Sequence, residues 1–332
     1  MRSTLSGPRR ASYVLVVLAL YLAVRFGLAH ALIGGLFAAM ILDQAQAGLI
    51  GAGASPRVAR WSAVGLFLVV GVLLAVVFAE FVRIGMERLP TLLDRLAPRL
   101  NALGDRFGVD LPVDNVQELR GAILDALKSN AKSVETLSGL LTRGFFQLIL
   151  VLAVVILRFL SDAPAPAHAK GHGLDVDVLK ECRARAAQFA ASFELVMGAQ
   201  ILISAIYTVI AAIFLIAARI PFRTMLTLAT FMCGLVPIVG NLISNSLIVG
   251  AALTKSDHLA LAALVYLVVV HKGGYFLNSR IVGARMDTPT WAILLGLLVG
   301  EALMGVSGVI LAPTMIHYVL AELRAIPRAE AA

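Results

Sequence analysis

Charged residues are scarce in this sequence. Only 14% of its 332 residues are Asp, Glu, Lys or Arg, whereas soluble domains carry about 25%. Hydrophobic residues make up 60% of the chain, and the mean hydropathy is +0.90. A globule of this composition has too few polar residues to cover its apolar core. The composition therefore excludes an ordinary soluble enzyme and predicts a polytopic membrane protein.

Motifs for metal binding and for nucleotide hydrolysis are missing as well. The two cysteines, Cys182 and Cys233, are too few for a disulfide framework or a four-cysteine zinc site. Neither the HExxH pattern of zinc proteases nor the Walker A loop of ATPases occurs. We expect no enzyme activity, no cofactor and no metal site. The net charge of +8 comes from scattered basic residues, which favours a role in membrane orientation over nucleic-acid binding.

Two weaker motifs have simpler explanations. Residues Gly305–Gly308 read GVSG, which resembles the nucleophile motif of rhomboid proteases. The next histidine downstream, His317, would lie about 15 Å further along a helix, so glycine-mediated packing is the better interpretation. His168 and His172 have the spacing of a metal-binding pair, but the adjacent glycines favour a loop.

Long apolar blocks predict the membrane spans, because about 20 apolar residues are needed to cross a bilayer core of about 30 Å. The expected spans are a helical hairpin at 11–29 and 31–50, then 61–82, 143–160 and 187–218, followed by apolar blocks at 222–253, 259–277 and 288–322. The first and last of these later blocks are too long for one straight helix. The fold class is thus an all-α polytopic integral membrane protein of about eight transmembrane helices, with broken or re-entrant helices in the C-terminal half.

Residues 83–142 differ from the spans. They are rich in charge, and their leucines and other apolar residues recur three or four positions apart, which predicts an amphipathic helical hairpin outside the membrane. It could lie on the bilayer surface or pack against the transmembrane body. The expected organisation is 1–82 with helices one to three, 83–142 as the hairpin, 143–218 with helices four and five and a polar loop at 161–186, and 219–332 as the irregular half.

Basic residues set the expected orientation. Arg9 and Arg10, Arg57 and Arg60, and the lysines and arginines of 161–186 fall on one side of the membrane if the N-terminus is cytoplasmic. Eight spans return the C-terminus to the same side. The loop at 278–288 does not fit this pattern, because it would place Arg280 and Arg285 outside.

Carboxylates at membrane depth are the first candidates for function. A buried charge there costs at least about 2.5–3.5 kcal/mol. Glu301 stands in the most apolar stretch of the C-terminal half, where it could bind a proton or cation that drives transport. The alternative is an ion pair with Arg219, Arg280 or Arg285. Glu194, near the start of the fifth span, is a second candidate, with simple surface exposure as its alternative.

Interruptions of the backbone are the second candidate feature. Pro237 and Gly240 should break a helix beside Asn241 and Asn245, and transporters use such breaks to bind ions or substrates. The alternative is a kinked packing helix whose asparagines bond across an interface. The expected substrate or ion path comprises Pro237, Gly240, Asn241, Asn245, Asn278, Arg280, Gly283, Pro289, Glu301, Gly305, Gly308 and Pro313.

Several short motifs occur in a characteristic order. They are Leu235–Gly240 (LVPIVG), Phe276–Gly283 (FLNSRIVG), Thr288-Pro289, and Gly305–Gly308 followed by Ala312-Pro313. Together they resemble the autoinducer-2 exporter family of bacterial permeases, and the order of elements fits along nearly the whole chain. Asn241 and Ser279 stand where that family often has proline, and Glu301 replaces a small residue, so the substrate is not carried over.

The resemblance implies a transporter of the bacterial inner membrane that forms a homo-oligomer. Members are proposed to export a small furanone signal or to exchange sodium for protons. We therefore expect a permease that exports a small polar solute by alternating access. One alternative is a sodium/proton antiporter, and another is a non-transporting scaffold that binds a partner through 83–142. The expected partners are the lipid bilayer, the solute, sodium or protons, and further copies of the chain.

Overall fold

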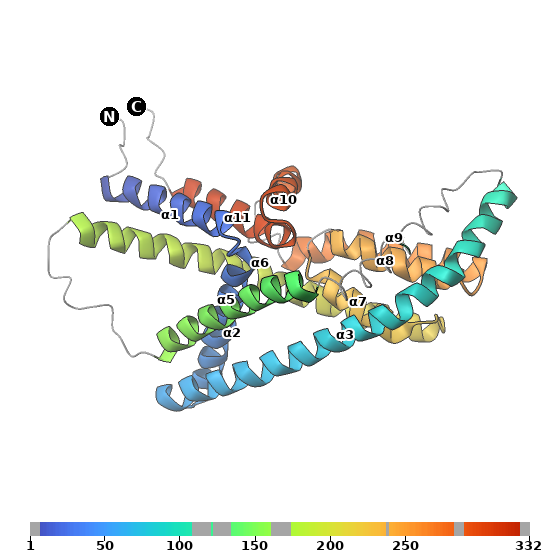
Figure 1. The fold of residues 1–332 in the computed structure, drawn as a ribbon, viewed down its shortest axis with the longest axis horizontal. Helices are drawn as coiled ribbons and strands as arrows, with labels where there is room; N and C mark the ends of the chain where they lie inside the picture. The colour runs from blue at the N-terminus through green and yellow to red at the C-terminus, as the bar shows by residue number, and fades with distance from the viewer. Residues whose placement is uncertain are drawn as a thin grey trace. The chain divides into compact units, whose positions relative to one another are not determined.

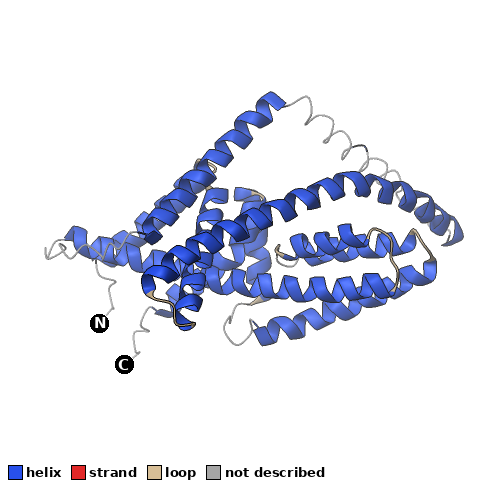
Figure 2. Cartoon of the chain, turned by 90° about the horizontal axis from the view of Figure 1, so that it is seen from below, coloured by secondary structure: helices blue, strands red, loops and turns tan. Residues whose placement is uncertain are grey.

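In a computed structural model of the chain, α-helices make up almost all of the described structure (Figures 1 and 2). The structure describes residues 7–107, 121, 134–160, 174–236, 239–281 and 289–325. Within these ranges there is no strand. The predicted all-α fold is confirmed.

In the part of the chain that the structure describes, five helices are long and apolar enough to cross a membrane. They are α1 (Gly7–Arg25), α2 (Ala29–Gly51), α3 (Pro56–Phe107), α6 (Leu174–Ala217) and α11 (Val306–Ala325). Shorter apolar helices lie within α5 (Val134–Leu160), α8 (Val239–Leu253) and α10 (Thr290–Met304). The polytopic membrane architecture predicted from the sequence is therefore confirmed.

The first apolar block is divided into α1 and α2 by a turn at residues 26–28, but α1 contacts α6 and α11 through Tyr13, so the block does not form the closely packed hairpin that the sequence predicted. Gly27 occupies this turn with a φ of +67°, a left-handed conformation that a residue without Cβ adopts without strain. The first helix thus ends slightly earlier than the sequence indicated.

Helix α3 continues without interruption across position 82, where the apolar span was expected to give way to the amphipathic hairpin. Pro90 and Pro98 lie inside it. Leu92 and Ala97 of its amphipathic part are buried, so this stretch packs against protein. The change at 83 is therefore a change of sequence pattern along one helix. Most of the second arm of the expected hairpin lies outside the described residues.

Two helical hairpins account for the long apolar blocks of the C-terminal half. Block 222–253 forms α7 (Arg223–Gly234) and α8, and block 288–322 forms α10 and α11, which meet at Gly305. At 1.5 Å per residue α7 is about 18 Å long, and α8 and α10 are each about 22 Å. All three are shorter than a bilayer core of about 30 Å. The predicted broken or re-entrant helices are confirmed, and α9 (Asp257–Ile281) lies between the two hairpins in the sequence.

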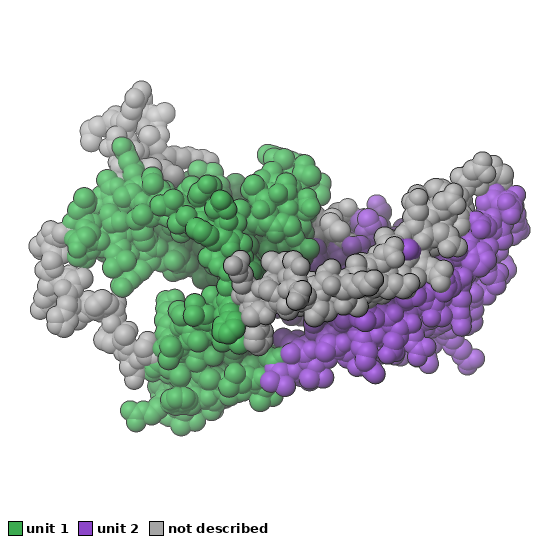
Figure 3. Space-filling model, viewed as in Figure 1, with its two compact units in different colours: residues 1–71, 143–198, 286–332 green, residues 72–142, 199–285 purple. Residues whose placement is uncertain are grey.

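The chain divides into two compact units (Figure 3). Unit 1 comprises residues 1–71, 143–198 and 286–332, and unit 2 comprises 72–142 and 199–285. The borders at 71/72, 142/143 and 198/199 fall inside α3, α5 and α6. These three helices therefore belong to both units, and no loop separates the units at these borders.

Each unit has its own apolar core. In unit 2, the beginning of α7 packs against the end of α8, so these two helices run antiparallel. The core of this unit includes Leu92, Leu215, Met225, Leu226, Ile248 and Ala252. In unit 1, α6 packs on α11 and α2 through Ile33, Phe193, Val196, Met197 and Leu311. A second cluster of unit 1 joins α2 to α3 through Ala38, Leu42, Val64 and Phe67, and Leu152 of α5 packs against it.

Candidate functional site

Side chains of α6 form hydrogen bonds to the end of α7, where the interruption between α7 and α8 begins. The last carbonyl groups of a helix have no partner inside that helix and need one elsewhere. Gln200 Nε2 donates to the carbonyl of Gly234 at 2.5 Å, and Ser204 Oγ donates to that of Phe231 at 2.8 Å. Side chains of one helix thus satisfy the free end of another.

The backbone completes this arrangement. The N–H groups of Leu235 and Val236 donate to the carbonyls of Met232 and Cys233, at 3.3 and 2.9 Å. Each of the last four carbonyls of α7 therefore has a partner. The end of α7 is therefore fixed by hydrogen bonds, and its last four carbonyl groups already have donors.

Gln200 and Ser204 were not among the residues singled out from the sequence. With Thr208 they repeat every four positions along α6, which places them on one helix face. Thr208 itself donates to the carbonyl of Ser204 at 2.7 Å. The signal was this polar stripe inside the apolar run 187–218, and it could have been read from the sequence.

On the other side of the interruption, Gly240 is required by close packing. A Cβ at this position would collide with the backbone carbonyl of Cys233. Asn245 is buried, with 4% of its surface exposed, and Asn241 is partly buried. Pro237 lies outside the described residues. Unit 2 thus buries an amide side chain on the short helix that follows the interruption.

In unit 1 the expected glycines bring α10 and α11 into backbone contact. A Cβ on Gly300 would lie 2.6 Å from the carbonyl oxygen of Gly308, and a Cβ on Gly308 would collide with the carbonyl of Gly300. Gly305 makes the turn between the helices with a φ of +59° and a ψ of −140°. Pro313 is buried within α11, where its missing N–H leaves the carbonyl of Val309 without its usual helical donor.

The two candidate carboxylates differ in their surroundings. Glu301 is exposed on α10, and no described residue of unit 1 forms a hydrogen bond or ion pair with its side chain. Glu194 is also exposed, but it accepts a hydrogen bond of 2.9 Å from Gln44 Nε2 of α2. Asp43 of α2 interacts electrostatically with both Glu194 and Arg158 of α5. Glu194 is therefore part of a polar group shared by three helices.

The expected path residues fall into two groups. Gly240, Asn241 and Asn245 belong to unit 2, together with Asn278 and Arg280, of which only the backbone within α9 is described. Pro289, Glu301, Gly305, Gly308 and Pro313 belong to unit 1, where the exposed Pro289 precedes α10 as its N-cap. Gly283 lies outside the described residues.

A buried ion pair in unit 1 was also missed by sequence reasoning. Arg185 was counted with the polar loop 161–186, but it lies in α6 and pairs with Glu322 of α11 at 3.2 Å. Glu181 contacts the same guanidinium at 2.8 Å. Tyr13 of α1 donates to Glu322 at 2.8 Å, and its ring centroid lies 4.7 Å from the guanidinium carbon of Arg185. This network joins α1, α6 and α11, which the sequence separates widely.

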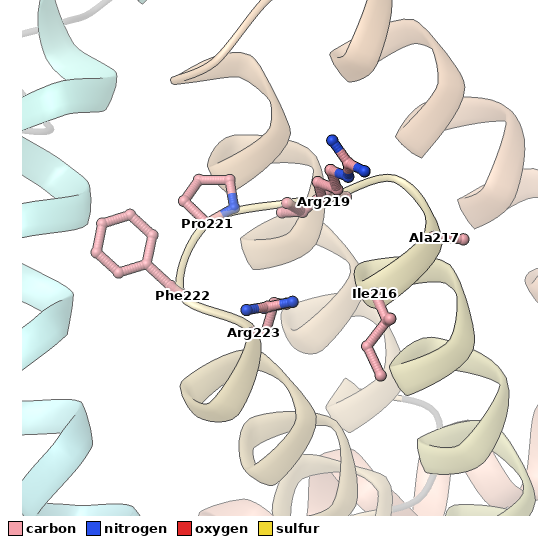
Figure 4. A pocket seen from close by; sticks show the side chains of 7 residues that line it. Ile216, Ala217, Arg219, Pro221, Phe222 and Arg223 are labelled. Atoms are coloured by element: carbon pink, nitrogen blue, oxygen red, sulfur yellow. The ribbon is translucent and has the colours of Figure 1, made fainter.

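A hollow of about 740 Å³ opens at the turn between α6 and α7 (Figure 4). It is lined by Ile216, Ala217, Arg219, Ile220, Pro221, Phe222 and Arg223. In Figure 4 the side chain of Arg223 extends between Ile216 and Phe222, and Arg219 lies on the other side of the turn. The hollow therefore combines two cations with an apolar wall.

The described residues contain no group of three or more His, Cys, Asp or Glu side chains that could hold a metal ion. His168 and His172, the pair considered from the sequence, lie outside those residues.

The structure has several features of a polytopic membrane transporter. They are helices long enough to cross a bilayer, short helical hairpins, and an interrupted helix whose end is hydrogen-bonded by side chains of α6. The family model described as AI-2E family transporter matches residues 11–328, nearly the whole chain. The chain belongs to this family, as its motifs indicated. No curated protein sequence matches the chain.

Proposed function

We propose that the chain exports a small polar solute across the bacterial inner membrane by alternating access, and that it has no enzymatic activity. The solute would be recognised beside the interruption between α7 and α8. In the same proposal the chain forms a homo-oligomer, both termini are cytoplasmic, and residues 83–142 serve as scaffold or oligomer contact.

The observation that carries this proposal is the pair of hydrogen bonds from Gln200 and Ser204 to the end of α7. Polar side chains inside an apolar helix are costly unless they are bonded, and intramembrane breaks are tolerated only inside protein or beside a cavity. Here the polar stripe of α6 holds a helix end at the interruption, and α8 buries Asn245. The amide side chains of Asn245 and of the partly buried Asn241, beside this interruption, suit a small solute with hydroxyl or carbonyl groups.

Efflux from proteoliposomes tests the proposal. The protein would be reconstituted with the furanone signal inside, and release would be followed with wild type, Q200L and N245L. We expect release by wild type and a loss of about tenfold or more in each variant, since each removes a polar group from the site. Q188L, on the same helix but outside the polar stripe, is the matched control. Equal release by all four proteins would contradict the proposed site.

Sodium/proton exchange is the second candidate function, because Glu194 is grouped with Asp43, Gln44 and Arg158. A sodium gradient imposed on liposomes with an internal pH dye measures it. Sodium-dependent proton flux that is lost in E194Q and kept in E301Q would assign coupling to Glu194, and the reverse result would assign it to Glu301. Without flux in the wild type, the antiporter function is wrong.

A further inference from the structure

The turn between α6 and α7 has an unusual backbone. Arg219 and Phe222 both adopt left-handed conformations, with φ of +50° and +60°, which non-glycine residues rarely occupy. Phe222 is the N-cap of α7 and provides no side-chain hydrogen bond to the first turn of that helix. The first N–H groups of α7 therefore have no side-chain cap from Phe222, and the helix dipole adds partial positive charge at this end of the helix.

Four cationic side chains surround the same turn. Arg219 and Arg223 line the hollow. Lys255 Nζ donates to the carbonyl of Arg219 at 2.9 Å, and the guanidinium carbon of Arg95 lies 5.7 Å from the ring centroid of Phe222. The charge of Lys255 and Arg95 is thus held beside the hollow by contacts with the turn itself. An anion that enters the hollow would meet Arg95 of α3, Arg223 of α7, Arg219 of the α6–α7 turn and Lys255 of the α8–α9 turn.

An exposed apolar strip leads to this cationic hollow. Val209, Ile213 and Ile216 of α6 are 59%, 63% and 60% exposed, and their spacing places them on one face of the helix. The apolar helix ends at Ala217, and the first arginine follows two residues later. Such a change from exposed aliphatic side chains to arginines is typical of the boundary between hydrocarbon and headgroups.

We propose that this hollow binds the headgroup of an anionic phospholipid, with one acyl chain lying along Val209, Ile213 and Ile216. Arg219 and Arg223, which line the hollow from the two sides of the turn, would bind different oxygens of the headgroup, because guanidinium groups match phosphate oxygens in charge and geometry. The excess of positive charge disfavours phosphatidylcholine, whose choline cation would approach the same arginines. Phosphatidylglycerol, which has a neutral headgroup alcohol, has no such penalty.

The test uses the full-length protein, delipidated in a neutral detergent and titrated with long-chain phosphatidylglycerol or phosphatidylcholine. Native mass spectrometry counts the bound lipid, and the melting temperature reports stabilisation. We expect phosphatidylglycerol to bind more tightly than phosphatidylcholine. R219Q/R223Q should weaken phosphatidylglycerol binding by about 30-fold, since each basic residue near a membrane surface contributes about 1 kcal/mol.

The matched control is R25Q/R57Q, which removes two exposed arginines from helix ends of unit 1 and should leave binding unchanged. R219K/R223K keeps the charge and should bind more tightly than R219Q/R223Q. If R219Q/R223Q fails to fold, the single variants R219Q and R223Q replace it, each with an expected loss of about fivefold. Equal binding of the two lipids, an equal loss in R25Q/R57Q, or a lysine variant as weak as the glutamine variant would overturn the proposal.

Two further arms identify the source of the phosphate. Sodium phosphate at millimolar concentration should neither raise the melting temperature nor displace the lipid, and if it does both, the hollow is an inorganic anion site. Dihexanoyl phosphatidylglycerol, with short chains, should bind more weakly than the long-chain lipid. Equal affinity of the two would contradict the role of the aliphatic strip.

Discussion

Arg185 of α6 and Glu322 of α11 form an ion pair with 3.2 Å between nitrogen and oxygen, and less than one tenth of either side chain is exposed. Tyr13 of α1 donates a hydrogen bond to the same carboxylate. The first and last described helices of the chain are therefore joined through one buried charge pair. This relationship gives the first of four predictions.

R185M should strongly destabilise the protein, by about 3–5 kcal/mol, because it leaves the buried carboxylate of Glu322 without its cation. Melting temperature in detergent, monitored by size-exclusion chromatography, measures the effect. R185M/E322L removes both charges and should recover much of the loss. A double variant less stable than R185M would show that the pair is not the main contribution of these residues.

The backbone contact between α10 and α11 should not tolerate a methyl group. G308A would place a Cβ against the carbonyl of Gly300 and force the helices apart, at a cost of about 1–3 kcal/mol. Gly65 of α3 has nothing within 4 Å of an added Cβ, so G65A is the control and should be neutral or stabilising. Equal melting temperatures for the two variants would contradict the contact.

The turn at Gly305 should require glycine for a different reason. Nothing lies within 4 Å of an added Cβ at this position, yet its φ of +59° and ψ of −140° suit only glycine. G305A should therefore destabilise the hairpin by about 1–3 kcal/mol through the backbone alone. Limited proteolysis measures the effect. The α10–α11 turn should be cut faster in G305A than in wild type. An unchanged cleavage rate would count against strain at this turn.

Gly71 and Gly198 stand at the unit borders inside α3 and α6, and an added Cβ on either would meet nothing within 4 Å. Packing therefore does not explain them, whereas glycine weakens a helix by about 0.5–1 kcal/mol relative to alanine. We expect G71A/G198A to melt at a higher temperature and to transport more slowly, because helix bending becomes harder. G65A in α3 is the control for transport. Transport by G71A/G198A at the rate of wild type would exclude a bending role for these glycines.

The helical framework could be predicted from local patterns. Signals within a few residues mark the turn between α1 and α2, the interruption after Gly234 and the glycine-rich turn at Gly305. The continuity of α3 past 82 was missed because a helix can change from an apolar to an amphipathic pattern without a break. Pro90 and Pro98 did not indicate the length of α3, because proline usually ends a helix and both prolines lie inside this one.

The polar contacts were harder to predict, because they depend on which helices pack together. Arg185 looked like a loop cation because its immediate neighbours are polar, and Glu322 lies far along the chain. Their pairing follows from the antiparallel packing of α6 on α11, which no local pattern encodes. Glu301 was a candidate coupling carboxylate because its neighbours in the sequence are apolar, yet it is exposed on the surface of α10.

The unbroken length of α3 has a mechanical consequence. About 54 Å of helix separates Gly71 from Phe107 at 1.5 Å per residue. A bend of about 10° at Gly71 would carry the far end of this lever through about 9 Å if the rest stayed straight. A change confined to one turn of helix, and to one residue without a side chain, would thus produce a displacement comparable to the size of a small solute.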